Sequence, residues 1–180
     1  VFSLEQGLQF VAGRAKLLDE EATRGSMALV MAGEEQVTPL LDGLEGRLAL
    51  AAVNGAQHTV ISGESRALEQ VLETLRSKGI GGERLAVSHA FHSPLIEPAL
   101  SGLARLAGQV NFATPRLDLV STLSGQLETE GLSVPDYWTR HARQPVCFAK
   151  GMQTLHQEGG QIFIEIGPQP VLLAMGQRCL

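Results

Sequence analysis

Residues 47–62, RLALAAVNGAQHTVIS, predict two β-strands joined by a tight turn. The first strand covers Arg47–Val53 and the second covers His58–Ser62. Between them lies Asn54-Gly55, a dipeptide typical of the two-residue turns that join hairpin strands. An antiparallel hairpin is therefore the first feature that the sequence predicts.

Further elements flank this hairpin on each side. A buried-strand run at residues 27–32 and a short helix at 34–41 precede it, and a helix at 65–78 and a fourth strand at 84–88 follow it. The order strand, helix, strand, strand, helix, strand is that of a ferredoxin-like split βαβ unit. We predict such a unit over residues 26–88.

Helices and short apolar strands alternate outside this unit. Ser3 and Gln6 form a capping box that starts a helix running to about Glu21. After residue 89 we predict helices at 93–107, 135–142, 145–157 and 169–178, and strands at 117–122 and 161–166. Such alternation is typical of a parallel sheet flanked by helices. Residues 1–25 and 89–180 would thus form a larger α/β part into which residues 26–88 are inserted.

The strands outside the hairpin unit are too few for a complete sheet. The chain also begins at Val1-Phe2 without a methionine. We therefore expect a fragment whose upstream residues supply further strands. The unpaired apolar surface left behind would favour aggregation.

Composition excludes several classes of protein. The 180 residues carry 19 acidic and 14 basic side chains, a net charge of −5, which argues against a general nucleic-acid binder. Cys147 and Cys179 form no C-x-x-C pattern, which favours a reducing, cytoplasmic setting. No apolar run is long enough to predict a transmembrane helix, and no signal-peptide pattern is present.

Two histidines follow the fourth predicted strand, and the second is a candidate general base. His92 comes directly before Ser93-Pro94, which opens a helix. The positive end of a helix dipole disfavours imidazolium, so a histidine there stays able to accept a proton. An ordinary surface or core role is the alternative. His89 and His92 do not predict a zinc site, because Glu97 is the only carboxylate nearby.

A base requires a nucleophile, and the chain contains no G-x-S-x-G motif. The nearest pattern, Gly63-Glu64-Ser65-Arg66-Ala67, lies between a strand and a helix, where Ser65 serves equally well as a helix-capping residue. Arg14 lies off the centre of its helix's apolar stripe, so the residues alone favour a solvated arginine there.

Five ordered motifs carry a family resemblance that covers essentially the whole chain: VNG at 53–55, VISG at 60–63, SHAFHSP at 88–94, YW at 137–138 with RQPV at 143–146, and EIGP at 165–168. Together they resemble the acyltransferase domains of modular type I polyketide synthases. Those domains are similar to malonyl-CoA:acyl-carrier-protein transacylases. The fold implied is α/β: a partial α/β-hydrolase-like large subdomain with an inserted ferredoxin-like small subdomain.

The resemblance also implies roles for single residues. In the family, a serine in a G-H-S-x-G elbow attacks the thioester with a histidine as base, and the acyl group then passes to the phosphopantetheine thiol of an acyl carrier protein. His92 matches the base, and Arg14 matches the arginine that pairs with the extender carboxylate. His141, or a neighbour within residues 140–144, matches the position whose carbonyl orients the imidazole.

The segment His89-Ala90-Phe91-His92 resembles the HAFH signature of malonyl-selective domains, whereas methylmalonyl-selective domains usually carry YASH. A bulky Phe91 would narrow the space beside the substrate's α-carbon. Because a methyl group in a pocket is worth only about 1–3 kcal/mol, this implies a preference for malonyl-CoA that need not be absolute.

The elbow serine of the family has no counterpart in the chain, so we expect these 180 residues alone to form no acyl-enzyme. The expected partners are malonyl-CoA, an acyl carrier protein and the adjacent ketosynthase and linker domains, with no nucleic acid, membrane, metal or cofactor of its own. The alternative is a non-catalytic module that docks a carrier protein or a neighbouring domain. A more distant alternative is a self-contained hydrolase that uses Ser65 and His92.

Overall fold

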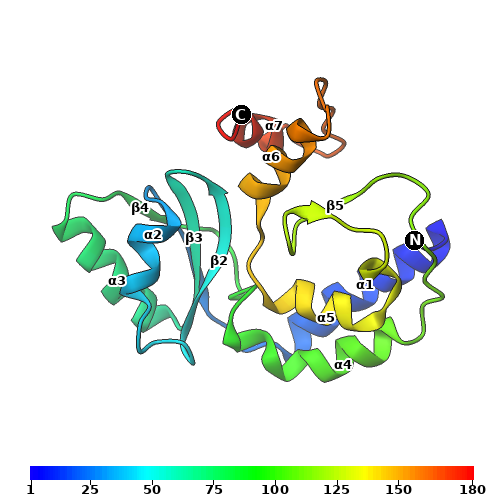
Figure 1. The fold of residues 1–180 in the computed structure, drawn as a ribbon. Helices are drawn as coiled ribbons and strands as arrows, with labels where there is room; N and C mark the ends of the chain where they lie inside the picture. Colours follow the sequence, from blue (N-terminus) through cyan, green and yellow to red (C-terminus); the bar gives the residue numbers. More distant parts are fainter.

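The computed structural model describes all 180 residues, and its first half contains a four-stranded antiparallel sheet (Figure 1). The strand order is β2-β3-β1-β4. The strands are β1 (Ser26–Val30), β2 (Leu48–Gly55), β3 (His58–Gly63) and β4 (Gly82–Arg84). The connecting helices are α2 (Glu34–Val37), continued by a 3-10 turn at Thr38–Leu40, and α3 (Ser65–Ser77). This order and connectivity confirm the predicted ferredoxin-like unit.

The period-2 alternation of the strands divides their side chains between two faces of the sheet. Val30 and Ile61 are fully buried and pack with the apolar face of α3, including Leu68. Met27 and Val60 point to the opposite face, where they pack against the rest of the molecule. β3 is therefore covered on both faces, so that all of its residues after His58 are buried.

The second part of the molecule is built on three packed helices (Figure 1). They are α1 (Leu4–Glu21), α4 (Glu97–Ala107), which follows a 3-10 turn at Pro94–Ile96, and α5 (Pro135–Arg143). Phe10 and Trp138 meet edge to face with their ring centroids 5.3 Å apart, and Phe112 stacks on Trp138 at 5.6 Å. Aromatic contacts therefore join α1 to α5 in this core.

The C-terminal part contains β5 (Val120–Ser121) and β6 (Gln126–Leu127), a 3-10 turn at Gly131–Ser133, α6 (Phe148–Gln157) and α7 (Val171–Gly176). Within it, α6 lies against β2, an edge strand of the four-stranded sheet (Figure 1). The Val53 amide donates to the Val146 carbonyl at 2.9 Å, and the Val146 amide donates to the Ala51 carbonyl at 2.9 Å. These bonds attach the segment before α6 to β2.

The two larger hydrophobic cores draw on different parts of the chain. One uses residues between 28 and 75, and the other uses residues 10–22 and 96–142. Phe91 packs against the second of these cores and also against the outer face of the sheet. The boundaries at residues 25/26 and 88/89 stay predictions, because the joining segments contact both parts.

The fourth strand begins and ends earlier than the sequence predicts. β4 spans Gly82–Arg84. The strand expected at 84–88 is therefore wrong after Arg84, where one further bond, from the Leu85 amide to the Met27 carbonyl, joins the chain to β1. The Val87 amide then bonds back to the Leu85 carbonyl at 2.9 Å, which turns the chain away from the sheet. Leu85 and Val87 are consequently 38% and 41% exposed.

The strand predicted at 161–166 does not form, and neither does the parallel sheet predicted around it. Ile162, Ile164 and Ile166 are 86%, 81% and 97% exposed. The strand expected at 117–122 is reduced to β5, which pairs antiparallel with β6. A strand is stable only beside a hydrogen-bonded neighbour, and no segment of the chain pairs with residues 161–166.

α1 has the predicted bounds, and the Ser3 hydroxyl accepts from the Gln6 amide at 3.2 Å. Its buried face carries Phe10 and Leu18, whereas Leu4, Leu8 and Val11, which share the expected apolar stripe, are 80%, 63% and 61% exposed. None of the helices has the length and apolar character needed to cross a bilayer.

Candidate active site

His92 lies in a tight turn between β4 and the 3-10 turn that opens α4. It is the only non-glycine residue with a positive φ, at 58°. The Ser93 hydroxyl donates to the Ala90 carbonyl at 2.6 Å and accepts from the Leu95 amide at 3.2 Å. These bonds hold the backbone on both sides of His92 and stabilise a conformation that costs an L-residue about 1–2 kcal/mol.

The imidazole of His92 is oriented by a backbone carbonyl from a distant part of the chain. Its Nδ1 lies 2.8 Å from the carbonyl oxygen of Gln144, the residue that ends α5. A carbonyl only accepts, so Nδ1 carries the proton and the lone pair of a neutral ring lies on Nε2. This is the tautomer that a general base requires.

The pKa of His92 is lowered, mainly because the ring is buried. The hydrogen bond to Gln144 opposes this change, and the positive charge of Arg14 adds to it. The cause therefore differs from the helix dipole invoked from the sequence. The consequence is the same: His92 is neutral near neutral pH and can accept a proton.

Arg14 projects from α1 into a cavity of about 510 Å³ that it shares with His92. Burial lowers the pKa of its guanidinium, and no side chain or carbonyl of the chain forms a hydrogen bond or ion pair with it. An unpaired, partly buried guanidinium is a strong binding group for a carboxylate. Arg14 is thus half-buried in the cavity and not fully exposed on an open face of α1, and its role as the carboxylate-binding group stays a prediction.

Some residues of the HAFH segment line the cavity, and others support the turn beneath it. His89 and Phe91 line the cavity beside His92, with the rings of His89 and Phe91 6.0 Å apart. His89 is 3% exposed, and its Nδ1 lies 2.9 Å from the Ser88 hydroxyl. Ala90 is fully buried outside the cavity lining, so it supports the turn and does not form the cavity wall.

His141 lies beside the site, but its carbonyl does not orient His92. That bond belongs to Gln144, at the end of the segment predicted to provide it. The rings of His141 and His92 lie 6.4 Å apart at 77°. Burial first, then the charges of Arg14 and His92, lower the pKa of His141 to about 4.

Ser65 does not join this constellation. Its hydroxyl lies 2.7 Å from that of Ser26, which also accepts from the Arg84 guanidinium, and no hydrogen bond joins Ser65 to His92. A serine and histidine pair that acts as nucleophile and base needs hydrogen-bond reach, so the self-contained hydrolase is not supported. No group of three or more histidine, cysteine, aspartate or glutamate side chains is arranged to hold a metal ion.

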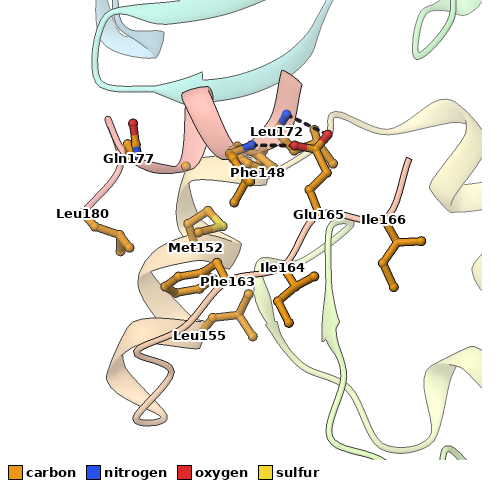
Figure 2. A pocket seen from close by; sticks show the side chains of 12 residues that line it. Phe148, Met152, Leu155, Phe163, Ile164, Glu165, Ile166, Leu172, Gln177 and Leu180 are labelled. Carbon is orange, nitrogen blue, oxygen red and sulfur yellow. Dashed lines mark hydrogen bonds between the residues drawn. The ribbon is translucent and has the colours of Figure 1, made fainter. Parts of the chain in front are cut away.

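A separate apolar cavity of about 290 Å³ lies between α6, α7 and residues 163–166 (Figure 2). It shares no lining residue with the His92 cavity. At its edge the Glu165 carboxylate accepts from the backbone amides of Val171, Leu172 and Leu173 at 3.1, 3.0 and 2.9 Å. These bonds lower the pKa of Glu165 and assign it a structural role, the capping of α7.

Comparison with known proteins gives the same family that the sequence motifs resemble, over the whole chain. The family model described as the acyl transferase domain matches residues 1–180. The chain is 41% identical to the spectinabilin polyketide synthase system protein NorB from Streptomyces orinoci, covering 100% of this chain and 8% of that protein. It is 39% identical to mycoketide-CoA synthase from Mycobacterium tuberculosis, with 100% of the chain and 4% of that protein covered.

Solved structures of related proteins share this fold over all or nearly all of the chain. The acyltransferase domain from the second module of the salinomycin polyketide synthase superposes with a TM-score of 0.96 at 39% identity, covering 100% of this chain and 42% of that one. A malonyl CoA-acyl carrier protein transacylase from Clostridium perfringens gives a TM-score of 0.89 at 27% identity, covering 97% of this chain and 57% of that one. The chain therefore spans between 4% and 57% of the length of these proteins. It belongs to the acyl transferase domain family and has the α/β fold with the ferredoxin-like subdomain of polyketide synthase acyltransferases.

Proposed function

We propose that these residues provide the general base and the carboxylate-binding arginine of an acyltransferase that transfers a malonyl unit in polyketide synthesis. The observation that carries the proposal is one cavity containing His92, held by the Gln144 carbonyl, together with the unpaired guanidinium of Arg14. A base and a cation in one cavity suit an acyl donor that carries a free carboxylate. Malonyl-CoA is such a donor.

In this proposal the nucleophilic serine lies in a G-H-S-x-G segment outside the 180 residues. His92 Nε2 takes the serine proton as the oxygen bonds to the thioester carbonyl carbon. Collapse of the tetrahedral intermediate breaks the C–S bond, and His92 returns the proton to the coenzyme A sulfur. The phosphopantetheine thiol of an acyl carrier protein then gives its proton to His92 as its sulfur bonds to the malonyl carbonyl carbon. The ester C–O bond to the serine breaks, and His92 returns the proton to the serine oxygen.

Phe91 supports a preference for malonyl over methylmalonyl. It lines the cavity beside His92 and is held between the large helical core and the outer face of the sheet. A ring packed on two sides cannot move aside easily for an added methyl group. We expect Phe91→Ser to raise loading from methylmalonyl-CoA relative to malonyl-CoA by about tenfold, within the range that one methyl group controls.

The test uses an extended chain, defined as residues 1–180 joined to the preceding segment that carries the elbow serine. Single-turnover loading from malonyl-CoA, followed by intact mass, is compared between the wild type and His92→Asn. We expect the substitution to slow loading by at least about 100-fold, since it removes the general base. Equal loading by both proteins would contradict the proposal and leave the non-catalytic docking module as the better explanation.

A further inference from the structure

Two side-chain hydrogen bonds attach α5 to the end of β5. The Tyr137 hydroxyl lies 2.7 Å from the Ser121 hydroxyl, and His141 Nε2 lies 3.1 Å from the Thr122 hydroxyl. Tyr137 and His141 are one helical turn apart, and their rings stack at 5.8 Å with an angle of 26°. Ser121 and Thr122 therefore each bind one of two successive turns of α5.

The same Thr122 is joined to the segment that follows Gln144. Its carbonyl accepts from the Cys147 amide at 2.7 Å, and Val146 pairs with β2 through backbone bonds. The Gln144 amide bonds the Arg140 carbonyl at 2.8 Å, which continues α5 to this point. The carbonyl that orients His92 thus lies between His141 on one side and the Thr122-bound segment on the other.

From this arrangement we infer that His141 is a positioning residue: its imidazole, bonded to Thr122 and stacked on Tyr137, holds both the His92 ring and the Gln144 carbonyl in the geometry for proton transfer. The inference rests on the proposed function. His141 acts through its side chain on His92, at an edge-to-face separation of 6.4 Å. His141 does not line the cavity that His92 shares with Arg14.

The charges around His141 explain why an imidazole suits this position. Arg14 and His92 are the charged or titratable groups that act on it electrostatically. A carboxylate here would attract the guanidinium of Arg14 and compete with the substrate, and a permanent cation would repel Arg14 and the protonated form of His92. An uncharged ring that accepts or donates one hydrogen bond to Thr122 avoids both effects.

The experiment compares Thr122→Val, which removes the hydroxyl at nearly constant volume, with Thr122→Ser, which keeps it. Maximal single-turnover loading and half-saturating malonyl-CoA are measured on the extended chain across pH. We expect Thr122→Val to lower the maximal rate about tenfold with half-saturation unchanged, and Thr122→Ser to recover the rate to within about twofold. The apparent pKa of His92 in the rate profile should stay the same in both.

Three results would overturn the inference: an unchanged rate in Thr122→Val, a loss confined to half-saturation, or an apparent His92 pKa that rises, as general exposure of a buried ring to water would cause. If Thr122→Val does not fold, His141→Phe gives the same comparison, since it keeps the ring on Tyr137 and loses the bond. Failure of the proposed function is distinct: the wild type then takes up no malonyl group, or His92→Asn loads as fast as the wild type.

Discussion

Residue 92 combines an unfavourable backbone conformation with a well-oriented side chain. Its φ of 58° is maintained by the hydroxyl of Ser93 and by the bond from its own ring to Gln144. A strained backbone conformation of this kind persists where several independent contacts each restrain it. At this position it directs the ring toward the cavity that contains Arg14.

The guanidinium of Arg14 provides the first prediction. Arg14→Lys keeps a positive charge and loses the planar pair of donors that matches a carboxylate. We expect kcat/KM for malonyl loading of the extended chain to fall by about 10- to 100-fold, the range for one charge-assisted hydrogen bond. Acetyl-CoA, which lacks the carboxylate, is the control substrate: its loading should be unchanged in Arg14→Lys. Equal losses for both donors would contradict the assignment of Arg14.

His141 makes the stability of the fold depend on pH. Its pKa is about 4 in the folded state and 6.5 ordinarily, so the unfolded chain binds more protons between these values. The free energy of unfolding should therefore fall as pH decreases from 6.5 to about 4, by at most about 3 kcal/mol from this group. His92 contributes with the same sign, because its pKa is also lowered.

Urea unfolding of the wild type and of His141→Asn at several pH values checks this prediction. The variant lacks the group that titrates near pH 4, so the difference in stability between pH 6.5 and pH 4 should be smaller in it. Identical pH dependence in the two proteins would show that His141 titrates alike in the folded and unfolded states.

The sequence indicates some residues of the candidate site and gives no signal for others. His92 was accessible from its place before Ser93-Pro94, and the segment 140–144 came from the family motif, although the carbonyl proved to be that of Gln144. The unpaired state of Arg14 could not be read from α1 alone, since it depends on what packs around the helix. Thr122 carries no local signal, because its role comes from a contact with residue 141 across the fold.

Among the elements, the two strands of the central hairpin were predictable because their period is a local property. The tight turn expected at Asn54-Gly55 is wrong, because both residues belong to β2 and the turn falls at Ala56-Gln57, where Gly55 pairs with His58. The register of β4 was not predictable, since it depends on where the chain after α3 meets β1. Gly63 ends β3 with a φ of 150°, and a Cβ there would overlap the Arg47 carbonyl oxygen and lie 2.8 Å from Leu48 Cα. Only glycine therefore fits between β3 and the start of β2.

This close approach gives a prediction for the stability of the sheet. Gly63→Ala should lower the free energy of unfolding by on the order of 3 kcal/mol, because the added carbon displaces backbone atoms. Gly46→Ala is the matched control, since no heavy atom lies within 4 Å of its added carbon, and it should be neutral or slightly stabilising. Thermal melts of the two variants and the wild type test the difference, and a Gly63→Ala melt like that of the control would refute it.

Apolar side chains are exposed on the extended segment 161–166 and on the face of α1 that carries Leu4, Leu8 and Val11, among other positions. The parallel sheet failed as a prediction because strand signals are local, whereas pairing needs a neighbouring strand. The chain spans 42% of the salinomycin acyltransferase domain that it resembles, and we propose that the rest of such a domain covers both surfaces.

Exposed apolar surface predicts self-association of the 180-residue chain. Ile162 is 86% exposed in the unpaired segment, so Ile162→Lys should reduce association by adding charge to a strand edge. Leu117→Lys is the control, because Leu117 is 84% exposed and lies in a different loop. Light scattering over a concentration series checks this: a monomeric wild type, or equal effects of the two variants, would contradict the prediction.

We propose that these residues supply the base and the carboxylate-binding arginine to a serine located outside them. Intact mass after exposure to malonyl-CoA, measured on the 180-residue chain and on the extended chain side by side, tests it most directly. We predict that only the extended chain gains one malonyl group, on the elbow serine. Acylation of the 180-residue chain at Ser65, or no acylation of either chain, would contradict the account.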